Sequence, residues 1–265
     1  MPSVKKYVKR YKSRALWGKL RVSRMLKKDP ATAGLVPAAK PFSLERLTQM
    51  ASRYEMLYIK PNIGSLGMGV HRLRRTASGD YELASVLSRK QTTRSFRTID
   101  AVYRHLKRRK SGKKLLIQRG IPLDQVEGRP YDLRAMVQRR PKGPWTCTAF
   151  TAKIASPSKI VTNVHQGAKL VMLSSLWEMQ GLPASAARAN TDLIERKALA
   201  VSRSLSRRYK GMHEMGIDFA IDRSKKLWVL EVNTNHPQFR PVKKLDRAAY
   251  NRMASFARSY GRYDD

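Results

Sequence analysis

Apolar and polar positions alternate most clearly in the last third of the chain. Six apolar residues alternate with polar ones in two runs on either side of a polar turn: Ile217, Phe219, Ile221, Trp228, Leu230 and Val232. This period of two predicts a hairpin over residues 215–233 with these side chains on one face. A turn centred between Ser224 and Lys225 would place Asp218 directly opposite Glu231 on the other face.

Two carboxylates and an amide share this polar face: Asp218, Glu231 and Asn233. Like charges that face each other on paired strands cost roughly 0.2–1 kcal/mol, so a cation is expected to neutralise them. Oxygen ligands on a rigid hairpin suit Mg²⁺, which binds one or two carboxylates together with substrate phosphates. The alternative interpretation is a half-exposed hairpin whose polar residues only face solvent, and the rest of the chain decides between the two.

The same periodicities predict further elements along the chain. Strands are expected over residues 56–60, 70–74, 81–87, 115–118, 131–139 and 145–154. Helices are expected after the caps Ser43 and Thr98, over residues 184–210, and near 245–260. Strands and helices mixed in this order predict an α+β fold.

The first 28 residues contain eleven Lys and Arg and no acidic residue. Five residues among them fall at helical spacing: Val4, Tyr7, Val8, Tyr11 and Ala15. This spacing predicts a basic amphipathic helix, either a docking arm or, as the preferred interpretation, a solvated helix whose apolar stripe packs on the body of the protein. Residues 29–41 are rich in Ala and Pro and are predicted to form a linker.

Lys60 ends a predicted strand and is followed at once by a glycine-rich segment, residues 61–69. Glycines let the backbone approach phosphates closely, successive amides form an anion-binding nest, and a neighbouring Lys adds a point charge. The segment is therefore a candidate nucleotide clamp. The Gly-Lys-Ser/Thr ending of a Walker loop is absent, as are the His-Arg-Asp and Asp-Phe-Gly motifs of protein kinases.

Composition narrows the class of protein. With 265 residues, 42% of them hydrophobic, the chain can bury the core of one large domain or of two lobes. The single Cys147 excludes an intramolecular disulfide and a Cys-based zinc cluster. No apolar run approaches the ~20 residues of a membrane span, and no apolar segment of ~7–15 residues follows the basic start, so a cytoplasmic protein is expected.

Lys and Arg outnumber Asp and Glu by 55 to 19, which gives a formal net charge of +36. Such a field favours polyanionic partners, among them nucleic acid, acidic peptides, anionic cell-wall polymers and membrane surfaces. The alternative is a solvated, Arg-rich surface without a partner of its own.

An ordered set of motifs resembles the ATP-grasp superfamily: Tyr58–Pro61, Gly64–Val70, Leu116–Ile121, Gly128–Arg134, Ile160–Gly167, Gly216–Asp218 and Leu230–Asn233. The set is most similar to the YheC/YheD branch, which is described as endospore coat-associated. It also resembles ligases that add glutamate to ribosomal proteins and tubulin tails. The resemblance covers roughly residues 42–240.

This resemblance implies two α+β lobes with ATP between them. Residues 42–117 would form the small lobe, with the glycine loop, and 118–265 the large lobe, with the metal-binding hairpin and the C-terminal helix. Residues 1–41 would be a basic N-terminal extension and linker. Many related enzymes carry an N-terminal α/β domain that helps to bind the acceptor, so the sequence leaves open whether a partner completes the site.

The resemblance also implies roles for individual residues. Those expected to bind ATP are Lys60, Gly64, Ser65, Gly67, Gly69, Gln118, Arg119, Gly120, Ile121 and Asn163. Asp218, Glu231 and Asn233 would hold two Mg²⁺ ions. Lys60, Arg134 and Lys153 would be the catalytic groups, with Arg134 on the transferred phosphoryl group. Lys153 stands where related ligases often have Arg, whose fork a Lys does not reproduce.

The expected activity is that of an ATP- and Mg²⁺-dependent carboxylate–amine ligase that acts through an acyl phosphate. An acidic peptide or polymer is a candidate substrate, because a basic enzyme would attract it. The alternative is a non-catalytic basic protein of the same fold that binds a polyanion or a spore-coat component. The presence of all five of Lys60, Arg134, Asp218, Glu231 and Asn233 favours the enzyme.

Three acidic residues are expected to have ordinary roles. Glu214 is predicted to be a solvated charge at a helix end, and Asp132 an orienting partner of Arg134. Asp222 is predicted to be a turn residue. Trp145, Trp177 and Trp228 are predicted to pack in the core rather than to stack on bases.

Overall fold

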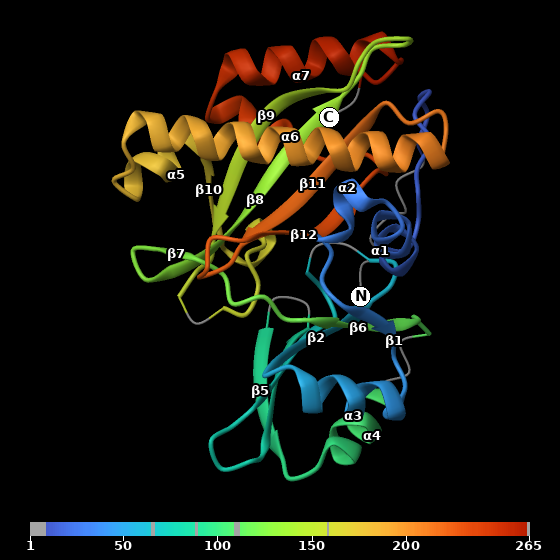
Figure 1. The fold of residues 1–265 in the computed structure, drawn as a ribbon, viewed down its shortest axis with the longest axis vertical. Helices are drawn as coiled ribbons and strands as arrows, with labels where there is room; N and C mark the ends of the chain where they lie inside the picture. The colour runs from blue at the N-terminus through green and yellow to red at the C-terminus, as the bar shows by residue number, and fades with distance from the viewer. Residues whose placement is uncertain (1–8, 65–66, 88–89, 109–111, 158, 264–265) are drawn as a thin grey trace.

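The computed structural model describes residues 9–64, 67–87, 90–108, 112–157 and 159–263. The chain folds into two lobes, each built on an antiparallel sheet, and Figure 1 shows them one above the other. Mixed helices and antiparallel strands confirm the predicted α+β class. None of the helices in the described ranges is long and apolar enough to span a membrane.

The small lobe is a sheet in the order β1–β6–β2–β3–β4–β5. Its strands are β1 (Ala39–Pro41), β2 (Met56–Pro61), β3 (Val70–Arg75), β4 (Tyr81–Leu87), β5 (Lys90–Phe96) and β6 (Leu115–Arg119). Helices α3 (Leu44–Arg53) and α4 (Ile99–Lys107) pack on one face through Leu47 and Val102. Ser43 and Thr98 cap these helices as predicted, because each hydroxyl accepts from the third residue that follows.

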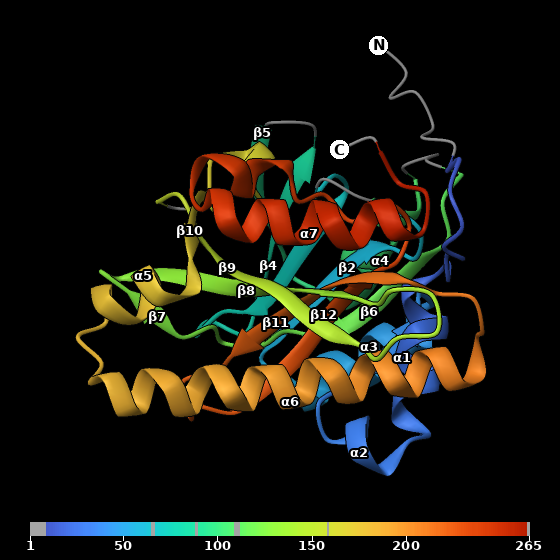
Figure 2. The same cartoon turned by 90° about the horizontal axis from the view of Figure 1, so that it is seen from above.

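The large lobe is a sheet in the order β10–β9–β8–β11–β12, with β7 paired to β8. Its strands are β7 (Gln125–Val126), β8 (Arg129–Gln138), β9 (Thr146–Ile154), β10 (Lys169–Met172), β11 (Glu214–Ile221) and β12 (Leu227–Asn233). Helix α6 (Ala184–Arg208) covers one face and α7 (Arg247–Ser259) covers part of the other (Figure 2). The uncovered remainder of that second face looks toward the small lobe.

Three short helical elements complete this lobe: η1 (Val164–Gln166), α5 (Leu173–Met179) and η2 (Arg240–Lys244). Trp145 and Trp177 lie in the core cluster beneath α6, as predicted. A direct contact joins the lobes on the opposite side of the sheet, where the Tyr58 hydroxyl donates to Ile160 O at 2.9 Å.

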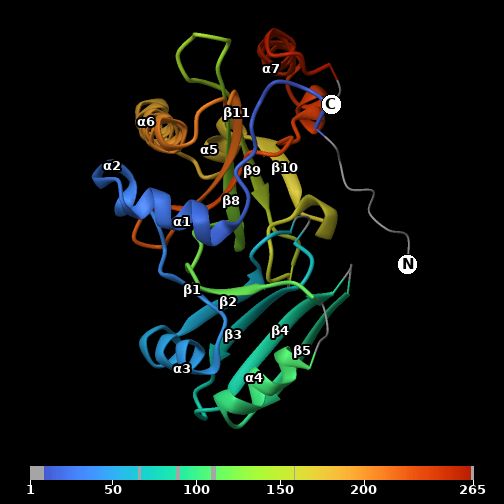
Figure 3. The same cartoon turned by 90° about the vertical axis from the view of Figure 1, so that its right-hand side faces the viewer.

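The N-terminal segment differs from its prediction. Residues 9–18 are not helical, whereas Val4, Tyr7 and Val8 lie outside the described residues. Helix α1 begins only at Lys19 and ends at Lys27, and α2 (Pro30–Ala33) follows within the predicted linker. Figure 3 shows α1 at the level where the lobes meet. Leu16, Val22 and Leu26 join the large-lobe core, so this segment is packed rather than appended.

The hairpin pairs as predicted at its open end and differently at its turn. Asp218 lies opposite Glu231, but Phe219 lies opposite Val229, so Leu230 is an extra residue in β12. The turn causes this shift, because Asp222 pairs with Lys226 around a loop centred on Ser224.

Because the bulge adds one residue to β12, the alternation of core-facing residues shifts by one position at Leu230. Val229 and Val232 pack in the large-lobe core, whereas Trp228 and Leu230 pack with Ile121 on the opposite face. The prediction that Trp228 and Leu230 share a face with Phe219 is therefore wrong. Because of the bulge, both residues face the lobe junction.

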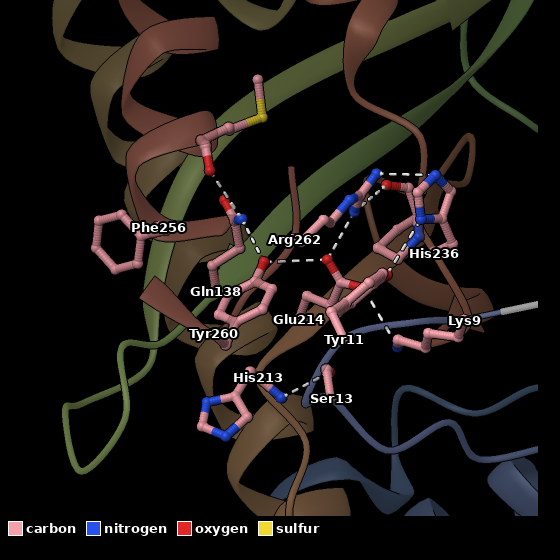
Figure 4. A network of polar contacts seen from close by, with 12 residues as sticks. Lys9, Tyr11, Ser13, Gln138, His213, Glu214, His236, Phe256, Tyr260 and Arg262 are labelled. Atoms are coloured by element: carbon pink, nitrogen blue, oxygen red, sulfur yellow. Dashed lines mark hydrogen bonds and ion pairs between the residues drawn. The ribbon is translucent and has the colours of Figure 1, made fainter. Parts of the chain in front are cut away.

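Glu214 also differs from its prediction, because it is completely buried at the start of β11. Its carboxylate accepts from Arg262 Nη1 at 2.6 Å, from the Tyr260 hydroxyl at 3.0 Å and from the Tyr11 hydroxyl (Figure 4). Lys9 Nζ lies 3.3 Å from it. Glu214 is thus the centre of a buried network rather than a solvated charge.

This network holds the loop that follows β12. Arg262 Nη1 donates to Pro237 O at 3.1 Å, and Lys9 Nζ donates to Thr234 O at 3.0 Å. The Tyr11 hydroxyl lies 3.2 Å from His236 Nδ1 (Figure 4). Both ends of the described chain therefore fix residues 234–237, directly after the hairpin carboxylates.

Candidate functional site

The charged residues of the large lobe lie in two adjacent rows of its sheet. In one row, Asp218 of β11 stands opposite Arg134 of β8 on one side and opposite Glu231 of β12 on the other. In the next row, Asp132 of β8 stands opposite Lys153 of β9. Residues two apart on a strand share a face, so all five side chains project toward the small lobe.

Cations and anions alternate along this surface. Arg134 forms a fork with Asp218, with Nε at 2.5 Å from Oδ1 and Nη2 at 2.8 Å from Oδ2. Lys153 Nζ bridges the rows, at 3.2 Å from Asp218 and 2.8 Å from Asp132. The prediction that Asp132 orients Arg134 is wrong, because Asp132 pairs with Lys153 and accepts from the Thr162 hydroxyl.

The two aspartates respond differently to burial. Burial raises the pKa of Asp132, and the opposing effect of Lys153 is too small to cancel this increase. Burial acts on Asp218 as well, but Arg134 and Lys153 together outweigh it and hold the pKa of Asp218 below its ordinary value. Asp218 is therefore the firmly ionised carboxylate of the site.

Asn233 completes the hairpin group. In the amide orientation that satisfies both of its ends, it donates to Glu231 Oε1 at 3.1 Å and accepts from Arg134 at 3.2 Å. Two carboxylates and one amide oxygen are hard donors and fit Mg²⁺. The described residues contain no group of three or more His, Cys, Asp or Glu that could form a metal site from the protein alone, so substrate oxygens would complete the shell.

Lys60 lines the cleft from the small lobe, near the end of β2. Burial lowers its pKa from 10.5 to about 8; Glu231 opposes this shift and Lys19 adds to it. A nearby anion would stabilise the charged form of this desolvated Lys.

The glycine loop follows Lys60. Gly67 and Gly69 both have positive φ, near +67° and +69°, a conformation that side chains rarely adopt. A Cβ on Gly67 would lie 3.5 Å from Asn163 Cβ, so the loop touches the large-lobe segment before η1. Ser65 lies outside the described residues.

Residues 118–121, called the hinge below, lead from β6 of the small lobe toward the large lobe and have separate environments. Gln118 is buried in the cleft wall and Ile121 packs on Trp228. The Arg119 guanidinium lies over the rings of Tyr54 and Trp228, 5.4 and 5.1 Å from their centroids. Cation–π contacts of this kind tie one lobe to the other.

Gly120 has a packing role instead. Its N–H donates to Met56 O at 2.8 Å, and a Cβ there would lie 2.9 Å from that oxygen. Because this amide is already bonded to β2, it is not free for a ligand.

A cavity of about 520 Å³ lies between the lobes. The predicted residues that line it are Lys60, Gly64, Gly67, Gln118, Arg119, Ile121, Arg134, Lys153, Asn163, Asp218, Glu231 and Asn233. Two predicted residues, Gly69 and Gly120, do not line it.

Sequence motifs missed several residues of the cavity wall. Lys19 reaches it from α1, and Phe239, Val242 and Met253 form an apolar end beneath α7. The only signal for Lys19 was the basic N-terminus, which gave no indication of the cleft.

Two facing α+β lobes with Lys, a glycine loop and hairpin carboxylates around one cleft define an ATP-grasp protein. The YheC/D-like ATP-grasp family model matches residues 9–263, and the chain belongs to that family. The endospore coat-associated protein YheD of Bacillus subtilis (strain 168) is 29% identical over 260 residues, 92% of this chain and 55% of its own length. The chain spans about half the length of the curated relatives it matches.

Solved structures share the fold at low identity. The D-alanyl-alanine synthetase A of Vibrio cholerae O1 biovar eltor str. N16961 has a TM-score of 0.51 and 12% identity, over 93% of this chain and 61% of its own. The ATP-grasp ligase PsnB, complexed with a phosphomimetic variant of a minimal precursor, Mg and ADP, also has a TM-score of 0.51 and 12% identity, over 91% and 58%. Both likenesses establish the fold.

Proposed function

We propose that this protein is an ATP- and Mg²⁺-dependent ligase that joins a carboxylate to an amine. One observation carries the proposal. Lys and Arg side chains, which suit phosphate, line the same cavity as carboxylate and amide oxygens, which suit Mg²⁺, although the two groups come from strands distant in sequence. A protein that only bound a polyanion on its surface would have no need for this paired arrangement inside a cleft.

ATP occupies the cleft with its triphosphate beneath the glycine loop. Lys60 pairs with the phosphates, and the backbone at Gly64 and Gly67 approaches them closely. The adenine lies against the hinge, between Gln118 and Ile121. Asn163 faces the phosphates from the large lobe.

Asp218, Glu231 and Asn233 are the residues that would hold Mg²⁺. When bound, the ion neutralises and orients the phosphate oxygens. Arg134 and Lys153 contribute to neutralising Asp218 through their contacts with it.

The reaction consists of two displacements. A carboxylate oxygen attacks the γ-phosphorus, the bond to the β,γ-bridging oxygen breaks, and ADP leaves with the electron pair. The amine nitrogen then attacks the carbonyl carbon of the acyl phosphate, phosphate leaves, and the nitrogen loses a proton. Arg134 and Lys153 offset the negative charge in both steps, which require positioning and charge neutralisation rather than a protein nucleophile.

The carboxylate substrate is an acidic peptide or polymer. A net charge of +36 steers polyanions to the protein, and the cleft concentrates cations where the reacting carboxylate arrives. The name of the Bacillus subtilis relative makes spore-coat components a suitable first source of such substrates.

Phosphate release with ATP and Mg²⁺ tests the proposal. Pools of amino acids, acidic peptides and cell-wall precursors should be compared, and Glu231→Gln provides the matched control because it keeps the shape of the side chain. We expect release that depends on one pool and is lost in the variant.

Release without any pool, or equal release by both proteins, contradicts the ligase. No release in any pool, together with no stabilisation of the protein by ATP and Mg²⁺, would instead favour a non-catalytic polyanion-binding protein. Such a protein should lose affinity for polyanions steeply as salt increases.

A further inference from the structure

The sheet face at the floor of the cleft changes from charged to apolar along β8. Asp132 and Arg134 stand in the charged rows, and Met136 comes next on the same face, opposite Ala149 of β9. Alternate residues of a strand lie about 7 Å apart, so this apolar row begins one step beyond the guanidinium. A molecule that reacts beside Arg134 therefore has an apolar surface within reach.

Helix α7 covers this row (Figure 2). Met136, Met253 of α7 and Val242 of η2 belong to one buried cluster. Phe239, directly before η2, completes the cluster and with it the apolar end of the cavity. Protein interiors contain few voids larger than a water molecule, so an apolar wall that opens into a charged cleft is typical of a ligand site rather than of a packed core.

Gln138, the next residue on this face of β8, ends the apolar row without offering a polar group. Its side-chain nitrogen donates to Met253 O at 3.1 Å and to the Tyr260 hydroxyl at 2.8 Å, and its Oε1 accepts from the Thr148 hydroxyl at 2.6 Å. A polar ligand group beside Met136 would therefore lose hydrogen bonds to water without a replacement from Gln138. This end of the cavity favours a hydrocarbon group.

The charged rows and the apolar end suit different substrates. Arg134 and Lys153 attract a carboxylate, which the proposed function activates beside them. The amine must then reach the carbonyl carbon of the acyl phosphate, and the part of the cavity one row further along β8 is the apolar end. An apolar environment also disfavours the ammonium form and thus favours the neutral amine, which is the form that attacks.

We propose that the apolar end of the cleft binds a hydrocarbon side chain on the amine substrate, and that the four side chains of this cluster determine which amine is used. This inference rests on the proposed function, because it assumes that the carboxylate occupies the charged rows. It adds the chemical class of the second substrate, an amine that carries an aliphatic or aromatic group, as an apolar amino acid does.

Met136 and Met253 can report binding at the apolar end without any need for turnover. The methionine methyl groups are isotope-labelled and observed by NMR in the protein loaded with ADP and Mg²⁺, and Met136→Leu and Met253→Leu assign the two signals. Leucinamide is titrated as the amine, asparaginamide as a polar amine of the same shape, and isocaproate as the same branched chain on a carboxylate. Met50, in the small-lobe core, is the internal control.

Variants at Val242 change the space at the apolar end in both directions. Val242→Phe fills it, Val242→Ala enlarges it, and Leu245→Phe adds the same ring at an exposed position directly after η2. We expect Val242→Phe to weaken leucinamide about tenfold or more, as for overpacking of a filled site. Val242→Ala should favour phenylalaninamide over leucinamide, and Leu245→Phe should match the natural protein.

In the natural protein, we expect leucinamide to shift the Met136 and Met253 signals and to bind about tenfold or more tightly than asparaginamide, whose amide would be buried without partners. Unmoved signals, equal affinities for the two amines, or equal losses in Val242→Phe and Leu245→Phe overturn the proposal. Tighter binding of isocaproate than of leucinamide overturns it as well, because the apolar end would then serve the carboxylate substrate. A natural protein that binds no ADP contradicts the proposed function instead, so the two failures are distinct.

Discussion

The guanidinium of Arg134 lies directly over the backbone of Gly216, on the neighbouring strand of the same sheet. A Cβ on Gly216 would lie 2.5 Å from Arg134 Nη1 and 3.0 Å from Pro237 Cβ. The missing side chain is what leaves room for the fork between Arg134 and Asp218. Gly216 thus belongs to the site although it carries no chemical group.

Gly216→Ala is therefore expected to displace Arg134. The fork with Asp218 would open, and we expect turnover of the proposed ligase to fall about 10- to 100-fold, since the group proposed to stabilise transferred charge would be misplaced. Adenosine affinity should change little, because the hinge is distant from the substitution. Gly128→Ala is the control, since nothing lies within 4 Å of its Cβ position, although its φ of +69° adds local strain. Normal turnover by Gly216→Ala would show that Arg134 can act from a shifted position.

The buried Glu214–Arg262 pair leads to a prediction about stability. Glu214→Gln would remove the buried carboxylate that accepts from Arg262, Tyr260 and Tyr11, and loss of one member of a buried ion pair costs about 3–5 kcal/mol in the free energy of unfolding. Urea unfolding measures the loss, and the exposed Glu178→Gln should leave stability unchanged. The double variant Glu214→Leu/Arg262→Met should be less destabilised than Glu214→Gln alone. A double variant that is destabilised as much as Glu214→Gln, or more, would contradict strong coupling of the pair.

The fate of Glu214 also illustrates what sequence patterns can establish. Local periodicity and motif order predicted the α+β class, the helix caps at Ser43 and Thr98, and the pairing of Asp218 with Glu231. These features depend on neighbours within one element or one hairpin. Burial of Glu214 depends on Arg262 and Tyr11, which lie 48 and 203 residues away, and no local pattern encodes such a meeting.

Lys19 and Leu230 were unpredictable for related reasons. Lys19 reaches the cleft only because α1 packs on the large lobe while Asn62 of the small lobe caps it. The prediction placed the centre of the turn between Ser224 and Lys225. The observed turn is one residue shorter, with Lys225 at a positive φ of 64°, and the bulge at Leu230 follows from this difference. A shift of one residue reverses every face beyond it, so the apolar pattern was correct and its assignment to one side was not.

Asp222 fixes that turn, which leads to a third prediction. Its Oδ1 accepts from Ser224 N and Lys226 N at 2.9 Å each, and its Oδ2 accepts from Trp228 Nε1 at 2.7 Å. Asp222→Ala would leave the buried Trp228 donor unpaired, at a cost of about 1–3 kcal/mol. Chemical unfolding should show this loss, whereas Arg223→Ala, an exposed change in the same turn, should have little effect. Equal stability of the two variants would mean that the bulge alone sets the register.

The lowered pKa of Lys60 predicts how nucleotide binding depends on pH. Burial holds this pKa at about 8 in the nucleotide-free protein, below the ordinary 10.5. A triphosphate beside the ammonium would raise it again, so the bound state holds a proton that the free state releases as pH rises past about 8. Affinity for ATP should therefore be highest below pH 8 and should fall above it, at most about tenfold per pH unit.

Calorimetry between pH 7 and 9.5 can measure both the affinity and the proton uptake, with buffers of different ionisation enthalpy. Lys60→Arg is the matched control, because a guanidinium stays protonated throughout this range and should give a flat profile. ATP affinity that declines equally in the natural protein and in Lys60→Arg would assign the titration to another group. A flat profile for the natural protein would mean that Lys60 does not face the phosphates.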